Sequence, residues 1–337
     1  MRSMASQTTN LTHFPPAWIG WIEENRVLGI DEPQLVDILV KNGFDRSAAR
    51  EQVSRASFEI KGSEKVSRKL RKLEAMMAAY SDLWLQSKPG KYVKRRTNLG
   101  ADEFFRSYYS VNLPVIFQDG LKSCPALAKW NPDYLKLRCG NEMVEVMSGR
   151  NRDRDYEINS NLHKTRTRLH EFVDRVKQAG KTNDFYMVAN NRSLESANMQ
   201  GLLNEVRILD NILDPARAQS RMFLWFGPGG TVTPLHHDAM NILLAQVYGR
   251  KTVTLIPSFQ TPWVYNHIGV YSPVDCEKPD YNKYPMFRKV TPLTVRLEPG
   301  QVLFIPVGWW HHVRSMDISI SLSFTNFRAA NDYVWED

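Results

Sequence analysis

The first quarter of the chain carries apolar residues at helical spacing. One apolar stripe begins at Trp18, and a second covers residues 35–40. A longer amphipathic pattern follows at residues 63–85, where apolar positions recur every three or four residues. We therefore expect residues 14–95 to form a helical N-terminal region. The polar stretch 1–13 in front of it shows no such period, and we expect it to be disordered.

The pattern changes after a break at Lys88-Pro89-Gly90. A charged, Asn-rich surface loop is predicted at residues 150–164. Short apolar or alternating segments predict strands at residues 114–117, 144–147, 185–189, 222–226, 235–238, 252–256, 293–297, 302–305 and 318–324. Many short strands separated by Gly or Pro are typical of a sandwich or barrel. We expect residues 96–337 to form one mainly β domain with some α-helix.

The last predicted strand has the clearest alternation in the chain. From Ile318 to Thr325, apolar and hydroxyl residues take turns without a break. Successive side chains of a strand point to opposite faces. One face should therefore pack on an apolar layer, and the other should be small and polar, as in the interior of a barrel that holds a polar ligand.

Charge is concentrated in one part of the sequence. Residues 61–96 contain eleven Lys or Arg and three acidic residues, an excess equal to the net charge of +8 for the whole chain. Such a segment is usually a solvated helix face followed by a charged linker. It also permits binding of nucleic acid through the phosphate backbone.

Composition excludes several classes of protein. No apolar run reaches the roughly 18 residues that a membrane span needs, and the first twelve residues lack the apolar core of a signal peptide. The three cysteines, Cys124, Cys139 and Cys276, have no CxxC spacing, which argues against a disulfide framework and a zinc ribbon. We expect a cytoplasmic protein.

Candidate metal ligands occur in two places. His236 and Asp238 form a His-x-Asp pair, and His311 follows the turn 306–308 about seventy residues later. On a strand, residues i and i+2 point the same way, so His236 and Asp238 share a side while His237 points to the other. Two imidazoles and one carboxylate are the facial triad of non-haem Fe(II) oxygenases. Catalytic zinc is the alternative for this ligand set.

An iron oxygenase also needs an anionic co-substrate, and three residues are candidates to hold it. Lys251 begins a predicted strand, from which its side chain can enter the barrel and pair with a carboxylate. Thr233 lies three residues before His236 and offers a hydroxyl, and Tyr186 offers a phenol. Arg250 should face the opposite way from Lys251.

Several of these segments together resemble a known family. Residues 226–238, 246–251 and 299–313 resemble, in this order, motifs of the JmjC/cupin-like hydroxylases. Among these they are similar to the asparaginyl hydroxylase group that inhibits hypoxia-inducible factor. The resemblance covers residues 99–327 and does not extend to the N-terminal helices.

The resemblance implies a double-stranded β-helix that binds Fe(II) and 2-oxoglutarate and uses O₂. It implies that His236, Asp238 and His311 are the catalytic metal ligands. Residues that match positions near the co-substrate are Lys251, Thr233, Tyr186, Asn241 and Ser323. At the position of Ser323, the asparaginyl hydroxylase group carries an asparagine.

We expect a 2-oxoglutarate-dependent dioxygenase that hydroxylates a protein or peptide side chain and converts 2-oxoglutarate to succinate. Three alternatives stay open: an N-methyl-lysine demethylase using the same chemistry, a hydroxylase of RNA or a small molecule, and a non-catalytic cupin-like binding protein. Any homodimer is expected to form through the N-terminal helices. The irregular segment 258–288, with Trp263 and Tyr265 taken as surface residues, is either a substrate lid or a packed loop.

Overall fold

The computed structural model describes residues 11–61, 64–189, 194, 197–218, 221–266 and 269–333. The chain folds into two compact units, of which the first contains the described residues up to Gln86 together with Phe259–Val290. The second unit contains Ser87–Ser258 and the chain from Thr291 onward. Most of the predicted disordered stretch 1–13 lies outside the described residues. Within those residues, no helix has the length and apolar character to cross a membrane.

The first unit begins with the predicted helices. They are α1 (Pro16–Val27), α2 (Glu32–Lys41), α3 (Arg46–Lys61) and α4 (Glu64–Gln86). Asp45 begins α3 by accepting a hydrogen bond from the backbone of Ala48 at 2.9 Å. The ring of Phe44 stacks on Phe14 with centroids 4.4 Å apart. Leu11 exchanges backbone hydrogen bonds with Gly43 and Asp45, so residues 11–13 are ordered.

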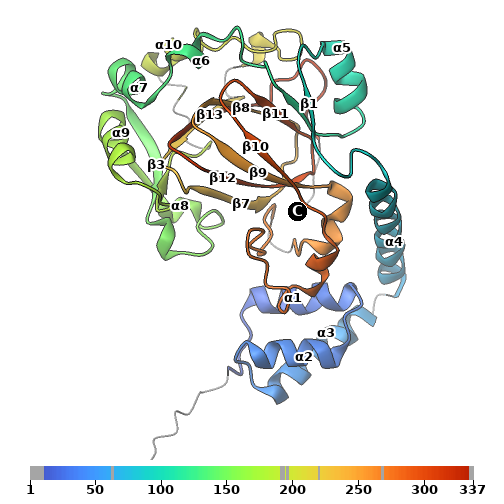
Figure 1. Ribbon diagram of the computed structural model, residues 1–337. Coiled ribbons are helices and arrows are strands. Elements are labelled where there is room, and N and C mark those ends of the chain that lie inside the picture. The colour runs from blue at the N-terminus through green and yellow to red at the C-terminus, as the bar shows by residue number, and fades with distance from the viewer. Residues whose placement is uncertain are drawn as a thin grey trace, which may run out of the picture. The chain divides into compact units, whose positions relative to one another are not determined.

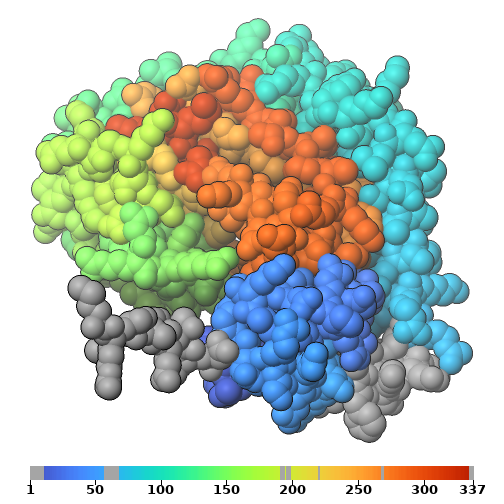
Figure 2. Space-filling view, turned by 60° about the horizontal axis from the view of Figure 1, so that its bottom comes forward, coloured from blue at the N-terminus to red at the C-terminus, as the bar shows by residue number. Residues whose placement is uncertain are grey.

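The segment Phe259–Val290 packs against these helices, which its position in the sequence did not reveal. The Tyr265 hydroxyl donates to Asn25 at 3.0 Å, and the Trp21 indole donates to the carbonyl of Lys283 at 2.8 Å. Figure 2 shows the orange surface of this segment directly against the blue N-terminal helices. Trp263 and Tyr265, predicted at the surface, are buried. The first compact unit therefore includes Phe259–Val290, whereas the predicted division at residue 95 assigned this segment to the β domain.

The second unit consists of two large sheets and one small one (Figure 1). The six-stranded sheet has the order β1-β2-β11-β8-β13-β6, the four-stranded sheet β10-β9-β12-β7, and the small sheet β4-β3-β5. From β6 to β13 the chain passes back and forth between the two large sheets, which is the topology of a double-stranded β-helix. The predicted fold class is confirmed.

The strands of the large sheets are β1 (Lys94–Arg96), β2 (Val115–Phe117), β6 (Met222–Gly227), β7 (Val232–His236), β8 (Ile242–Tyr248), β9 (Lys251–Ile256), β10 (Leu293–Leu297), β11 (Val302–Ile305), β12 (Trp310–Ser315) and β13 (Ser319–Phe324). The sequence did not predict β1 or β8, and it gave no bounds for β12, the strand expected to carry His311. β8 and β12 are almost fully buried, and their residues do not alternate between apolar and polar.

One face of the six-stranded sheet forms the main core of this unit. Leu243, Ala245 and Val247 of β8 and Phe304 of β11 pack there against helical residues such as Phe172. The helices and helical turns of the unit are α5 (Ala101–Phe104), η1 (Phe105–Tyr109), α6 (Pro125–Lys129), α7 (Pro132–Cys139), η2 (Arg150–Arg152), α8 (Ser160–His163), α9 (Leu169–Gln178), α10 (Ala197–Leu203) and η4 (Pro215–Arg217).

The polar face of β13 points into the barrel, as its alternation predicted. Ser319 and Ser321 both hydrogen-bond the buried side chain of Gln246, at 3.1 and 2.8 Å. Ser323 accepts a hydrogen bond from the Trp225 indole at 2.9 Å. The intervening residues of β13 belong to the apolar core on the other face. This face of β13 is therefore polar, and its three serine hydroxyls are paired.

The small sheet contains β3 (Met143–Ser148), β4 (Lys164–Arg168) and β5 (Phe185–Tyr186). Met187, directly after β5, forms an antiparallel bridge with Phe226 of β6. This bridge holds β5 next to the barrel. The segment predicted as a surface loop at 150–164 contains η2 and α8, and Arg150 within it is fully buried.

Candidate active site

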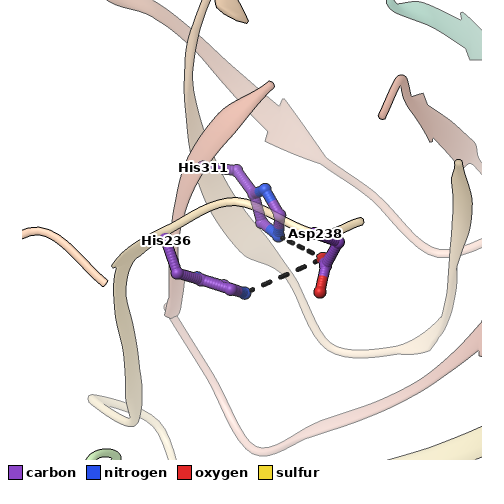
Figure 3. A group of neighbouring side chains, drawn as sticks. All are labelled: His236, Asp238 and His311. Atoms are coloured by element: carbon purple, nitrogen blue, oxygen red, sulfur yellow. Dashed lines mark ion pairs between the residues drawn. The ribbon is translucent and has the colours of Figure 1, made fainter. Parts of the chain in front are cut away.

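The two parts of the predicted triad meet in the barrel. Nε2 of His311 lies 3.3 Å from Oδ2 of Asp238, and Nε2 of His236 lies 4.0 Å from the same oxygen (Figure 3). The ligand atoms of all three residues lie within 4.8 Å of one another. Within the described residues, this is the one group of His, Cys, Asp and Glu side chains that could hold a metal ion.

Strand pairing explains how residues seventy positions apart come together. β7 and β12 are antiparallel neighbours, and His236 is the direct cross-strand partner of His311. Side chains of such a pair project from the same face of the sheet. Asp238 lies two residues beyond the end of β7, where the sequence had predicted continuing strand. Its carbonyl accepts a hydrogen bond from Gly308 in the turn that leads to His311.

The two imidazoles are oriented for a metal. Nδ1 of His236 lies 2.8 Å from the carbonyl of Pro234, and Nδ1 of His311 lies 3.0 Å from the carbonyl of Trp309. A carbonyl only accepts, so each Nδ1 carries the proton and each Nε2 presents its lone pair to the site. Two imidazole nitrogens and a carboxylate that converge in this way fit a divalent cation.

The charges of the ligands also suit metal binding. Burial lowers the pKa of His236 to about 4, and the nearby His311 adds to the effect. Burial alone would raise the pKa of Asp238. Contact with the two imidazoles, His311 foremost, outweighs it and holds that pKa below its ordinary value. At neutral pH the site therefore contains a neutral His236 and an ionised Asp238.

A β-bulge in β7 decides where Thr233 points. Along β12, His311 and Val313 are two residues apart and share a face. Their partners on β7 are His236 and Thr233, which are three residues apart, with the register shift between them. The extra residue of the bulge brings Thr233 to the same face as His236. Simple alternation would have pointed it the other way.

The same register places Lys251 on this face. Leu255 of β9 pairs with His311, and Lys251, four residues earlier, pairs with Ser315. At about 3.3 Å per residue, the Cα atoms of Leu255 and Lys251 are roughly 13 Å apart along the strand. A lysine side chain and a five-carbon dicarboxylate can together span this separation. Arg250 lies outside and pairs with Asp317.

Lys251 is buried without a carboxylate partner among the described residues. Its Nζ donates to the Tyr186 hydroxyl at 3.0 Å and lies 5.8 Å from the centroid of the Trp225 ring. Burial lowers the pKa of Lys251 to about 7 and raises the pKa of Tyr186. A buried ammonium that lacks an anion is a suitable binding group for a carboxylate.

Asn241 and Ser323 are buried and are engaged in other contacts. Asn241 accepts a hydrogen bond from the backbone of Val307 at 2.9 Å, and so supports the turn before His311. Ser323 holds the indole of Trp225. A direct role for either in co-substrate binding stays a prediction.

His237 and His312 do not join the triad. His237 packs edge-on against the ring of Trp310 with centroids 4.7 Å apart, and His312 pairs with Thr254 on the other face of the sheet. The sequence patterns did not point to Ser315, the partner of Lys251 across the strands, or to Trp225. For Ser315 a signal existed, because it lies four residues after His311 and must share its face.

The chain is similar to a family model and to several curated proteins. A family model described as a cupin-like domain matches residues 101–333. "Lysine-specific demethylase JMJ30" of Arabidopsis thaliana is 32% identical over 69% of this chain and 54% of its own length. "Lysine-specific demethylase 8" of Xenopus tropicalis is 34% identical over 66% of this chain and 50% of its own length. "Jumonji C domain-containing protein 5" of Drosophila melanogaster is 30% identical over 66% of this chain and 57% of its own length.

The chain spans about half the length of these curated relatives. The matched region nevertheless contains both large sheets from β2 onward and every residue of the metal group. The double-stranded β-helix, the converging triad and the family model lead to the same assignment. The chain belongs to the JmjC/cupin-like family of Fe(II)- and 2-oxoglutarate-dependent oxygenases.

Proposed function

We propose that this protein is an Fe(II)- and 2-oxoglutarate-dependent dioxygenase. One observation carries the proposal: by strand register, His236, His311 and the buried Lys251 share one face of the same sheet, and Asp238 converges on the two histidines. A zinc hydrolase would need the triad but has no use for a buried lysine without a counter-ion. In the overall reaction, a C–H bond, O₂ and 2-oxoglutarate give a hydroxylated product, succinate and CO₂.

Different residues of the site bind the metal and the co-substrate. His236, Asp238 and His311 would hold the metal from one side and leave the remaining positions open. The bound metal supplies the O₂-dependent oxidation of the substrate. Lys251 and Tyr186 bind the distal carboxylate of 2-oxoglutarate, with the Thr233 hydroxyl on the same face, and so orient its 2-oxo acid end toward the triad.

We propose a protein side chain as the substrate. Two of the relatives carry lysine-specific demethylase in their names, and their substrates are proteins. Hydroxylation of an N-methyl group gives a hemiaminal that releases formaldehyde, whereas hydroxylation of a side-chain carbon leaves a stable product 16 Da heavier. Formaldehyde production measured during turnover therefore separates the two outcomes.

Binding of nucleic acid and formation of a homodimer remain predictions. On α4, Arg68, Lys69, Arg71 and Lys72 are exposed, which is compatible with a salt-dependent RNA contact. Nucleic-acid binding is tested by comparing the RNA affinity of the wild type with that of an α4 variant that lacks these charges. The homodimer is tested by comparing the molecular masses of the same two proteins in solution.

The decisive experiment measures succinate formation with Fe(II), 2-oxoglutarate and cell extract. Asp238→Ala should abolish it, because two imidazoles alone hold the metal weakly and the carboxylate charge is lost. His237→Ala is the matched control, since this neighbour lies outside the triad and should retain turnover. A folded Asp238→Ala protein with wild-type turnover contradicts the ligand assignment, and a wild-type protein without turnover favours a non-catalytic cupin-like protein.

A further inference from the structure

Arg150 is a fully buried charged side chain of the second unit. Its side chain has no accessible surface, although it lies in a segment rich in charged residues. Its Nη2 donates to Glu157 at 2.9 Å and to the carbonyl of Val232 at 2.6 Å. Nε and Nη1 are buried and donate no hydrogen bond to the described protein atoms. Buried arginines with unused donors are rare and call for an explanation.

Stability does not supply that explanation. The side chain of Glu157 is only 10% exposed, and desolvation raises its pKa against the influence of Arg150. A buried ion pair costs much of its Coulomb energy in desolvation, so apolar residues often serve a core equally well. The groups that Arg150 contacts point instead to a role at the co-substrate.

The first of these groups is the backbone just before Thr233. The carbonyl of Val232 accepts from Arg150 and also from the Tyr156 hydroxyl at 3.0 Å. The Val232 amide donates to the side chain of Asn183 at 2.8 Å. These contacts fix the start of β7, and therefore the direction of the Thr233 hydroxyl on the inner face.

The second group is the ring of Tyr186. The Arg150 guanidinium lies 4.2 Å from the centroid of Tyr156 and 5.5 Å from that of Tyr186. Lys251 lies 5.7 Å from the centroid of the same Tyr186 ring. The centroid of the Tyr186 ring thus lies within about 6 Å of two buried cations, one on η2 and the other on β9. Cation–π attraction at such distances restrains a buried ring.

We propose that Arg150, paired with Glu157, is a positioning residue for the distal carboxylate of 2-oxoglutarate. It acts through Val232 on Thr233 and through the aromatic rings on Tyr186, without touching the metal ligands. The inference rests on the proposed function of the site. It adds a specific consequence: loss of Arg150 weakens recognition of the distal carboxylate and leaves recognition of the 2-oxo acid end unchanged.

The test uses the double variant Arg150→Met/Glu157→Gln, which removes both charges and leaves no uncompensated carboxylate. Arg175→Met is the control, because Arg175 stacks 3.8 Å over Phe185, the neighbour of Tyr186 on β5. Anaerobic Fe(II) titrations follow the charge-transfer band formed with 2-oxoglutarate and with pyruvate, which lacks the distal carboxylate. Co(II) absorption reports metal affinity.

The double variant should bind 2-oxoglutarate about 10- to 100-fold more weakly, the usual effect of removing a residue behind a ligand-binding group. Pyruvate and Co(II) affinities should stay within about twofold, and Arg175→Met should match the wild type. Equal loss for pyruvate and 2-oxoglutarate, or no loss for either, overturns the inference. If the double variant does not fold, Arg150→Lys takes its place: its charge remains but its reach is shorter, and the same selective loss is expected. A wild type without any band refutes the proposed function itself.

Discussion

Replacing Lys251 with methionine should stabilise the protein while impairing co-substrate binding. Methionine has nearly the same shape and no charge. In the folded protein, burial lowers the pKa of Lys251 from 10.5 to about 7. The unfolded chain therefore binds more protons than the folded one between pH 7 and 10.5. The lysine costs most stability below pH 7, and the cost disappears as pH rises through this window.

The size of the effect follows from this difference. Each pKa unit corresponds to about 1.4 kcal/mol, so at pH 7 the buried lysine costs about 4 kcal/mol. Methionine also removes the hydrogen bond to the Tyr186 hydroxyl, and the loss of this buried contact costs about 1–3 kcal/mol. The net stabilisation is therefore about 1–3 kcal/mol, a change typical of residues retained for function at the expense of stability.

Denaturant unfolding at pH 7 without 2-oxoglutarate measures the stability, and anaerobic titration measures 2-oxoglutarate affinity. Arg250→Met is the matched control: Arg250 is exposed and paired with Asp317, so both quantities should barely change. A Lys251→Met protein that is less stable than wild type, or that binds 2-oxoglutarate equally well, would refute this account of the lysine.

Two further predictions concern the same region. The 2-oxoglutarate dissociation constant should rise about tenfold from pH 6 to pH 8, because a Lys251 pKa of about 7 reduces the charged fraction over that range; a flat profile measured by titration would contradict it. Gly227→Ala should cost about 1–3 kcal/mol and weaken 2-oxoglutarate binding, since a Cβ there would lie 2.6 Å from Cδ2 of the buried Tyr186 ring. Thermal unfolding and the same titration test it, and unchanged values for both would show that the ring can move.

Much of the fold was accessible from sequence because alternation and turn residues are local signals. Strands with one polar face, such as β13, were predicted within a residue or two. β8 was missed and β12 was given no bounds because neither strand alternates, whereas the equally buried β11 is a short apolar run between turn residues. The segment Phe259–Val290 was assigned to the catalytic domain because it follows β9, whereas its packing partners are side chains more than 170 positions earlier. No local pattern encodes that partnership.

The site shows a subtler limit of sequence reasoning. Period-two alternation places His236 and Asp238 together but assigns Thr233 to the wrong face, although Thr233 was selected for its closeness to His236. The β7 bulge resolves the conflict by adding one residue between Thr233 and His236 relative to β12. Its position depends on pairing with β12, a strand about seventy residues away. The geometry of the co-substrate site is therefore a property of the paired strands, and a deletion that removed the bulge would turn Thr233 away from Lys251 without changing either residue.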